Sequence, residues 1–106
     1  MVYSRLKKSS DFSRVYNKGK SFADKYLVIY YVPNRLNETR VGFSISKKVG
    51  NSVVRNRVKR LIKESFRLNA NIKGHYDVIF IARVRAKEAD YKRIERSVNF
   101  LLRKLS

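Results

Sequence analysis

Three stretches of the chain carry apolar residues at the three- and four-residue spacing of an amphipathic helix. Residues 11–18 follow Ser9 and Ser10, either of which can cap a helix, and this pattern predicts a short helix. Residues 53–68 carry a longer apolar stripe, which predicts a helix of about four turns. The same spacing runs through residues 86–105 and predicts a long terminal helix.

Other segments have the composition and alternation of strands. Residues 27–32 are consecutive β-branched and aromatic residues, whereas residues 40–46 alternate between large apolar and small or polar side chains. Residues 77–82 are apolar on both faces, which is typical of a buried central strand. Residues 21–24 predict a further short edge strand.

These elements predict an α+β fold in the order α-β-β-β-α-β-α. We expect a sheet of about four strands packed with three helices. The 106 residues contain no internal repeat and no linker, so a single domain over residues 1–106 is expected.

The charge of the chain indicates a polyanionic partner. Twenty-six Lys and Arg residues oppose eight Asp and Glu residues, for a net charge of +18. Such a charge repels itself in a folded protein, and a phosphate backbone has the matching charge density. An anionic membrane surface is the alternative, and a basic amphipathic helix would be its signature, but the sequence also has strand-like runs and enough apolar residues for a core. The longest apolar run, residues 27–32, is too short to span a bilayer. We therefore expect an RNA-binding, cytoplasmic protein without a signal peptide or membrane partner.

The sequence argues against catalysis by the protein alone. It contains no cysteine and a single histidine, His75, which excludes disulfides, thiol nucleophiles and zinc sites built from cysteine or several histidines. The carboxylates are scattered without a metal-binding spacing, and no glycine-rich phosphate loop is present. We predict no catalytic residue and no protein metal site.

The predicted helix over residues 53–68 carries the main candidate surface. Its cations recur every four residues with Glu64 as the single acid, an arrangement that repels itself unless a phosphate lies nearby. The preceding turn at residues 50–52 directs backbone N–H groups and the helix dipole at the same corner. A merely solvated charged face is the competing interpretation. The predicted contact residues are Lys47, Lys48, Asn51, Arg55, Asn56, Arg57, Lys59, Arg60, Lys63 and Arg67.

A second candidate surface is aromatic. Phe12 and Tyr16 share one helix face, Tyr30 lies on the non-core face of its strand, and Gly42 and Ser44 leave space on the next strand. If these faces meet, they form a groove in which the bases of a single strand can stack. The alternative is that the rings only pack the helix on the sheet. The predicted contacts are Phe12, Tyr16, Tyr30 and Ser44.

These residues resemble the protein subunit of bacterial ribonuclease P. The motif spans residues 47–60, with Arg55-Asn56-Arg57 followed by Lys59-Arg60, and is quite specific. The similarity extends over nearly the whole chain and includes Arg5-Leu6-Lys7-Lys8 with Asp11-Phe12, Val41-Gly42-Phe43-Ser44, and residues 77–83.

The resemblance implies a ribonucleoprotein that removes the 5′ leader from precursor tRNA. An RNA subunit would be the catalyst, with Mg²⁺ held mainly by that RNA, and the protein alone would be monomeric. The basic helix would bind the RNA subunit, and the aromatic groove would bind the single-stranded leader. The family fold implies a ribosomal-protein-S5-domain-2-like α/β sandwich with a left-handed βαβ crossover. A general RNA-binding or ribosomal protein, and a protein-only nuclease, are the alternatives.

Overall fold

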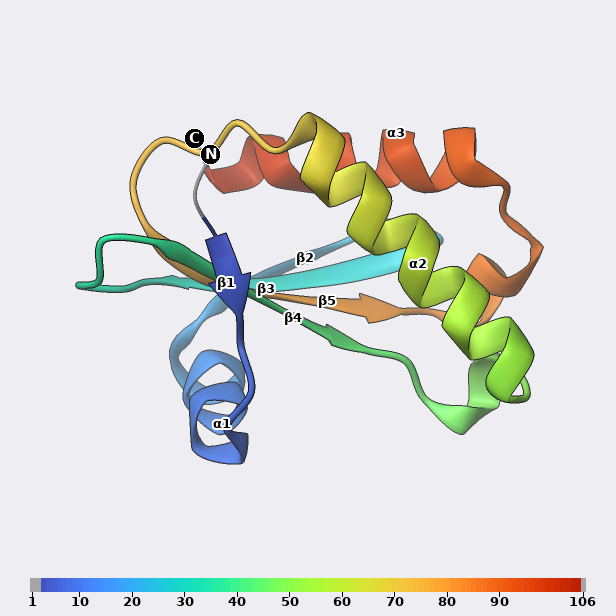
Figure 1. The fold of residues 1–106 in the computed structure, drawn as a ribbon, viewed down its shortest axis with the longest axis horizontal. Coiled ribbons are helices and arrows are strands. Elements are labelled where there is room, and N and C mark those ends of the chain that lie inside the picture. The colour runs from blue at the N-terminus through green and yellow to red at the C-terminus, as the bar shows by residue number, and fades with distance from the viewer. Residues whose placement is uncertain (1–2, 106) are drawn as a thin grey trace.

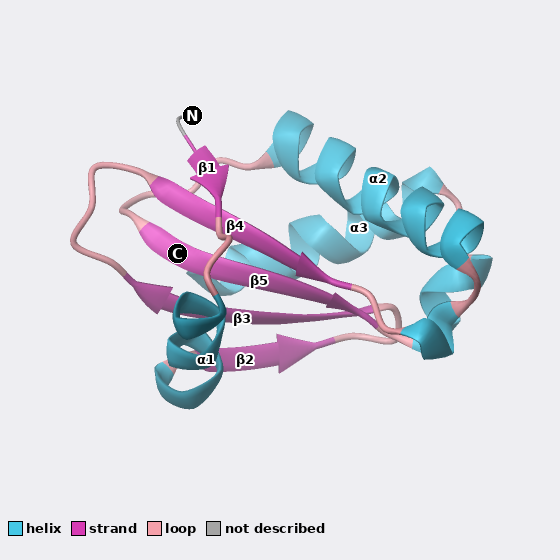
Figure 2. Ribbon diagram, turned by 60° about the horizontal axis from the view of Figure 1, so that its bottom comes forward, coloured by secondary structure: helices cyan, strands magenta, loops and turns pink. Residues whose placement is uncertain are grey.

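In the computed structural model, residues 3–105 form a five-stranded mixed sheet with one helix on one face and two on the other (Figures 1 and 2). The strands are β1 (Tyr3–Arg5), β2 (Lys20–Ala23), β3 (Leu27–Pro33), β4 (Thr39–Ser44) and β5 (Tyr76–Ala82). The helices are α1 (Ser9–Lys18), α2 (Ser52–Asn69) and α3 (Tyr91–Leu102), with 3-10 turns η1 (Lys47–Val49), η2 (Val84–Glu88) and η3 (Arg103–Leu105).

The sheet order is β1-β4-β5-β3-β2, which places β5 at the centre. Strand β4 is parallel to both β1 and β5, whereas β3 is antiparallel to both β5 and β2. The prediction that residues 77–82 form a buried central strand is therefore confirmed. Viewed from the α2 side with the parallel strands pointing up, β5 lies to the left of β4, so the β4-α2-β5 crossover is left-handed (Figure 2). General handedness rules favour the opposite hand.

The structure confirms the α+β class and corrects several boundaries. Strand β1 is additional to the roughly four strands expected, because three residues are too few to show a period-2 pattern. Helix α1 begins at Ser9 after Lys8, so neither Ser9 nor Ser10 is the cap. Helix α3 begins at Tyr91 rather than near Ala86, because the intervening residues form η2 and the Asp90 side chain caps the helix.

The main hydrophobic core lies between the sheet and the pair α2 and α3. Phe66 of α2 packs edge-on against Phe80 of β5, with ring centroids 5.8 Å apart, and both side chains are fully buried. A smaller core of Leu6, Val15 and Ile79 lies on the other face, beneath α1. The two cores fix which side chains of each strand face α1, and those side chains define one of the candidate surfaces described below.

The carboxylate of Asp77 joins α1 to the sheet. Asp77 is fully buried, and its oxygens accept hydrogen bonds from Arg40 of β4 (2.7 and 2.8 Å), from Asn34 in the β3–β4 connection (2.9 Å), and from Arg14 of α1. Burial by itself raises the pKa of Asp77, but the hydrogen bonds from Arg40, Asn34 and Arg14 outweigh it and hold that pKa below its ordinary value.

Asp77→Asn is expected to lower the free energy of unfolding at neutral pH by about 3 kcal/mol, because it removes the buried countercharge of Arg14 and leaves Arg40 with the more distant Asp11 at 3.4 Å. The pKa of Asp77 is depressed in the folded state, so its stabilisation is present at neutral pH and is lost as the pH falls below about 4. The variant should therefore show a weaker loss of stability on acidification. Urea unfolding between acidic and neutral pH measures both effects, with Glu88→Gln, at an exposed carboxylate, as the control. Equal stability of Asp77→Asn and the wild type would contradict this role.

Candidate nucleic-acid interface

The N-terminus of α2 is defined by a side-chain cap and by a close approach of the backbone at Gly50. The side chain of Asn51 accepts a hydrogen bond from the Val54 N–H at 3.0 Å and caps the helix. A Cβ atom at Gly50 would lie 2.8 Å from the Val54 side chain, so the chain enters the helix too closely for any larger residue. Lys47 and Lys48 are exposed in η1 at the same corner. Asn51, predicted as an RNA contact, therefore already has a structural role as the helix cap.

The predicted basic stripe turns gradually around α2. Residues spaced by four advance by more than one full helical turn, so the stripe drifts from the buried side towards solvent. Arg55 and Lys59 are half-buried at its start, whereas Lys63 and Arg67 are exposed at its end. Asn56 and Arg60 are also exposed, and they line a shallow hollow with Lys59, Lys63 and Glu64.

Three of the predicted cations have internal partners. The Nη2 atom of Arg55 donates to the Ser52 hydroxyl at 3.3 Å. Arg57 is half-buried and its Nη2 atom donates to the Ala89 carbonyl at 3.0 Å, which ties α2 to the segment before α3. Arg67 forms an ion pair with Glu64 at 2.6 Å. The Nη1 atom of Arg57 and the Nε atom of Arg55 are buried without a hydrogen-bond partner in the described part of the chain. Arg57 thus combines a structural contact with an unused donor.

Arg5 extends the basic surface beyond α2. Burial lowers the pKa of Lys59, and the nearby positive charges of Arg5 and Lys63 lower it further. Arg5, at the end of β1, also lies 5.6 Å from the centre of the Phe43 ring. The sequence analysis missed Arg5 as a surface residue, because the parallel pairing of β1 with β4 brings it to α2 across a long stretch of chain.

The aromatic residues meet on the opposite face of the sheet, at α1. Tyr16 remains 37% exposed, and its ring contacts the half-buried Tyr30 edge-on at 5.1 Å. Phe12 lies 6.4 Å from Tyr16, measured between ring centroids. The condition set by the sequence, that the faces carrying Phe12, Tyr16 and Tyr30 meet, is therefore fulfilled.

Gly42 does not form the open floor that the sequence suggested. A Cβ atom at Gly42 would lie 2.5 Å from Cζ of Phe12, so the Phe12 ring fills the space above the glycine. Phe12 therefore packs α1 on the sheet, although it is only partly buried, as Tyr30 is, whereas Tyr16 is exposed. Ser44 is half-buried, two residues further along β4.

Beyond α1, one row of residues crosses this face of the sheet. Backbone register aligns Ala23, Val28, Ile81 and Ser44 on neighbouring strands. Helix α1 covers the opposite end of these strands (Figure 2), and Val28 and Ile81 are only partly buried. We call Tyr16, Tyr30, Val28, Ile81 and Ser44 the aromatic cleft. Val28 and Ile81 were not predicted from the sequence as residues of this surface. Their strands carry apolar residues on both faces, and this pattern could have indicated a second apolar surface.

Within residues 3–105, no three His, Cys, Asp or Glu side chains group closely enough to hold a metal ion. No helix in that part of the chain is long and apolar enough to cross a membrane.

Comparisons with known proteins give one consistent result. A family model described as Ribonuclease P matches residues 2–106. The chain is 56% identical over 103 residues to a ribonuclease P protein component of Alkaliphilus metalliredigens, covering 96% of this chain and 93% of the relative. It is 55% identical to that of Clostridioides difficile over 101 residues, covering 93% and 89%.

Solved structures show the same similarity. The Staphylococcus aureus RNase P protein superposes with a TM-score of 0.87 at 40% identity, covering 94% of this chain and 93% of that protein. The Thermotoga maritima RNase P protein gives a TM-score of 0.83 at 30% identity, covering 93% and 96%.

Proposed function

The chain belongs to the ribonuclease P protein family, and we propose that it binds the catalytic RNA subunit and the precursor tRNA leader at the same time. As a ribonuclease P protein component, the chain associates with an RNA subunit. Together they form an endoribonuclease that processes tRNA. The observation that carries the proposal is the separation of two surfaces: basic α2 lies on one face of the sheet, and α1, whose Tyr16 contacts Tyr30 of β3, lies on the other (Figure 2).

In the proposal, α2 docks on the RNA subunit. Asn56, Arg60 and Lys63 present exposed cationic and amide groups around one hollow, with a shape and charge suited to phosphates and 2′-hydroxyls. Lys59 also lines this hollow and Arg5 lies near Lys59, so a phosphate there would relieve their mutual repulsion. Lys47 and Lys48 extend the same surface beyond the start of the helix.

The aromatic cleft would receive the single-stranded leader. Tyr16 and Tyr30 offer ring surfaces on which bases of any identity can stack, and Ser44 supplies a hydroxyl that can both donate and accept. This arrangement favours recognition of a single strand over recognition of a duplex.

The protein's part in the reaction is to bind and position RNA. Two of its carboxylates have structural partners in the fold: Asp77 binds Arg14, Arg40 and Asn34, and Asp24 binds Ser97. We therefore assign bond cleavage, and the Mg²⁺ ions that support it, to the RNA subunit. The protein holds the leader and the RNA subunit in a fixed relation, which lowers the entropic cost of aligning the scissile bond.

The direct test is cleavage of a precursor tRNA by the protein alone, by the RNA subunit alone, and by both together. We expect no cleavage by the protein alone, and tighter substrate binding when it joins the RNA. Cleavage by the protein alone would identify it as a nuclease. If the protein bound RNA without any gain in cleavage or substrate affinity, the general RNA-binding alternative would be favoured.

Arg60→Ala should weaken binding to the RNA subunit and make the dependence of log K on log salt shallower by about 0.7–0.9. Arg60 is exposed, so this variant tests a phosphate contact without removing a packing contact such as that of Arg57 with Ala89. The measurement is a salt titration of binding to the RNA subunit. Lys73→Ala, at an exposed loop lysine, is the control for total charge. An unchanged slope for Arg60→Ala would exclude a phosphate contact there.

Tyr16→Ala should reduce the preference of the holoenzyme for precursor over mature tRNA by about 1–3 kcal/mol, because it removes a stacking surface. Tyr16→Phe keeps the ring and should keep most of that preference. The measurement compares the affinities of the two RNAs for each reconstituted variant. If Tyr16→Ala weakened binding of both RNAs equally, the residue would have a structural role and no role in leader binding.

A further inference from the structure

A second aromatic and cationic surface lies on the side of the sheet opposite the aromatic cleft. Phe22 of β2 pairs in register with Ile29, so it faces the α3 side, where it stacks on Tyr31 with ring centroids 6.2 Å apart. Phe100 of α3 lies near it. We call this surface the β2–α3 face, which comprises Phe22, Tyr26, Arg93, Arg96, Phe100 and Lys104.

The two phenylalanines of this face share one cation. The Lys104 ammonium lies 5.5 Å from the centre of the Phe22 ring and 4.9 Å from that of Phe100. Each ring nevertheless remains 38% exposed. Exposed rings beside a positive charge are the combination that binds single-stranded nucleic acid, because the bases stack while the phosphates are neutralised.

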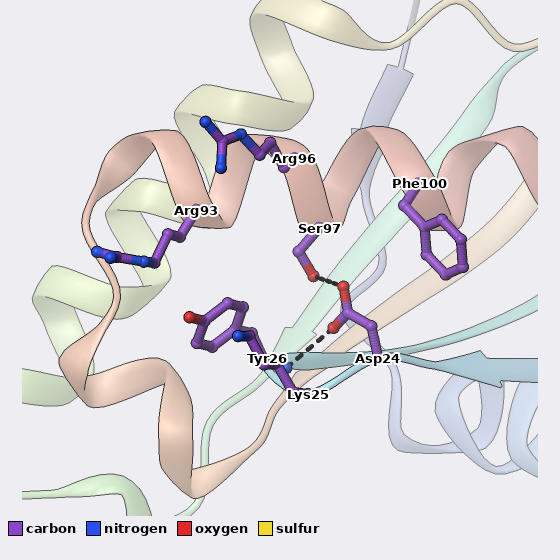
Figure 3. Close-up of a pocket in the computed structure, with 7 residues that line it drawn as sticks. All are labelled: Asp24, Lys25, Tyr26, Arg93, Arg96, Ser97 and Phe100. Carbon is purple, nitrogen blue, oxygen red and sulfur yellow. Dashed lines mark hydrogen bonds between the residues drawn. The ribbon is translucent and has the colours of Figure 1, made fainter.

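Beside Phe100, the face opens into a hollow lined by cations (Figure 3). Arg93 and Arg96 project outward from α3 at the rim of the hollow, away from the Tyr26 ring, and Arg93 also pairs with the exposed Asp90 at 3.5 Å. Asp24 at the base of the hollow is occupied: one carboxylate oxygen accepts the Tyr26 and Leu27 N–H groups at 2.9 Å, and the other accepts the Ser97 hydroxyl at 2.5 Å. This acid therefore anchors the turn between β2 and β3, and the arginines give the hollow its positive charge.

The β2–α3 face continues the aromatic cleft around one edge of the sheet. All four residues of β2 are exposed at that edge. Ser21 and Ala23 align with Tyr30 and Val28 on the cleft side, whereas Phe22 points to the other side. An RNA strand leaving the cleft at Ala23 needs to pass only one strand of the sheet to reach Phe22.

We infer that the β2–α3 face holds the distal part of the single-stranded leader, beyond the nucleotides in the aromatic cleft. This inference rests on the proposed function. The face has the ring surfaces, the positive charge and the continuity with the cleft that such an extension needs. A precursor with a leader too short to round the edge at β2 would gain nothing from it.

The experiment uses the holoenzyme reconstituted from the RNA subunit and full-length protein, with precursor tRNAs whose leaders have about 4 or about 16 nucleotides. The variants are Phe100→Ala, Lys104→Gln and the two combined, with Lys73→Gln as the matched control for loss of a lysine. We expect the double variant to bind the long-leader precursor about tenfold more weakly, as for the loss of one stacked base, and the short-leader precursor almost unchanged.

Three results would overturn the inference. The first is unchanged affinity for the long leader, and the second is an equal loss for both leader lengths. The third is weaker binding of the RNA subunit alone, which would make this face a dock for that subunit. The proposed function is judged separately, because Tyr16→Ala must still reduce the preference for precursor over mature tRNA whatever the Phe100 and Lys104 variants do.

Discussion

The buried carboxylate of Asp77 is the interaction on which the arrangement of both faces depends. It lies on the central strand and binds β4 through Arg40, the β3–β4 connection through Asn34, and α1 through Arg14. Helix α1 has only a small apolar core beneath it, formed with Leu6, Val15 and Ile79. A charged cluster in this position fixes the orientation of α1 more narrowly than apolar packing alone, because hydrogen bonds depend on direction as well as distance.

The sheet separates the densest positive charge, on α2, from the exposed ring pair of Tyr16 and Tyr30. Phosphate binding requires dense positive charge, whereas base stacking requires exposed rings. The chain places the densest charge on α2, which covers one face, and the rings of Tyr16 and Tyr30 on the other. The left-handed crossover from β4 to β5 contributes to this separation, because it places α2 on the face of the sheet that α1 does not cover (Figure 2).

Much of this organisation was predictable from periodicity and charge. The three helices, the strand alternation at Val41 and Phe43, and the basic character of α2 are all local patterns, and local patterns can be read along the chain. Other features depend on contacts between segments that are distant in the sequence. They are the hydrogen bonds of Asp77, the position of Arg5 near Lys59, and the Phe12 ring in the space above Gly42. No periodic signal records such pairings, so the sequence analysis treated Asp77 as one scattered acid and Gly42 as open space.

The position of β5 has a consequence for how the protein folds. This central strand pairs with β3 and β4, yet it is the last of the five described strands in the chain. A nascent chain that has released β1 to β4 still lacks the strand that joins β3 to β4, so the sheet can close only after most of the chain has left the ribosome. Until then, the aromatic and β-branched residues of β3 remain unpaired, and a chain with so many cations stays expanded. The sheet is therefore expected to close only after β5 has been synthesised and released.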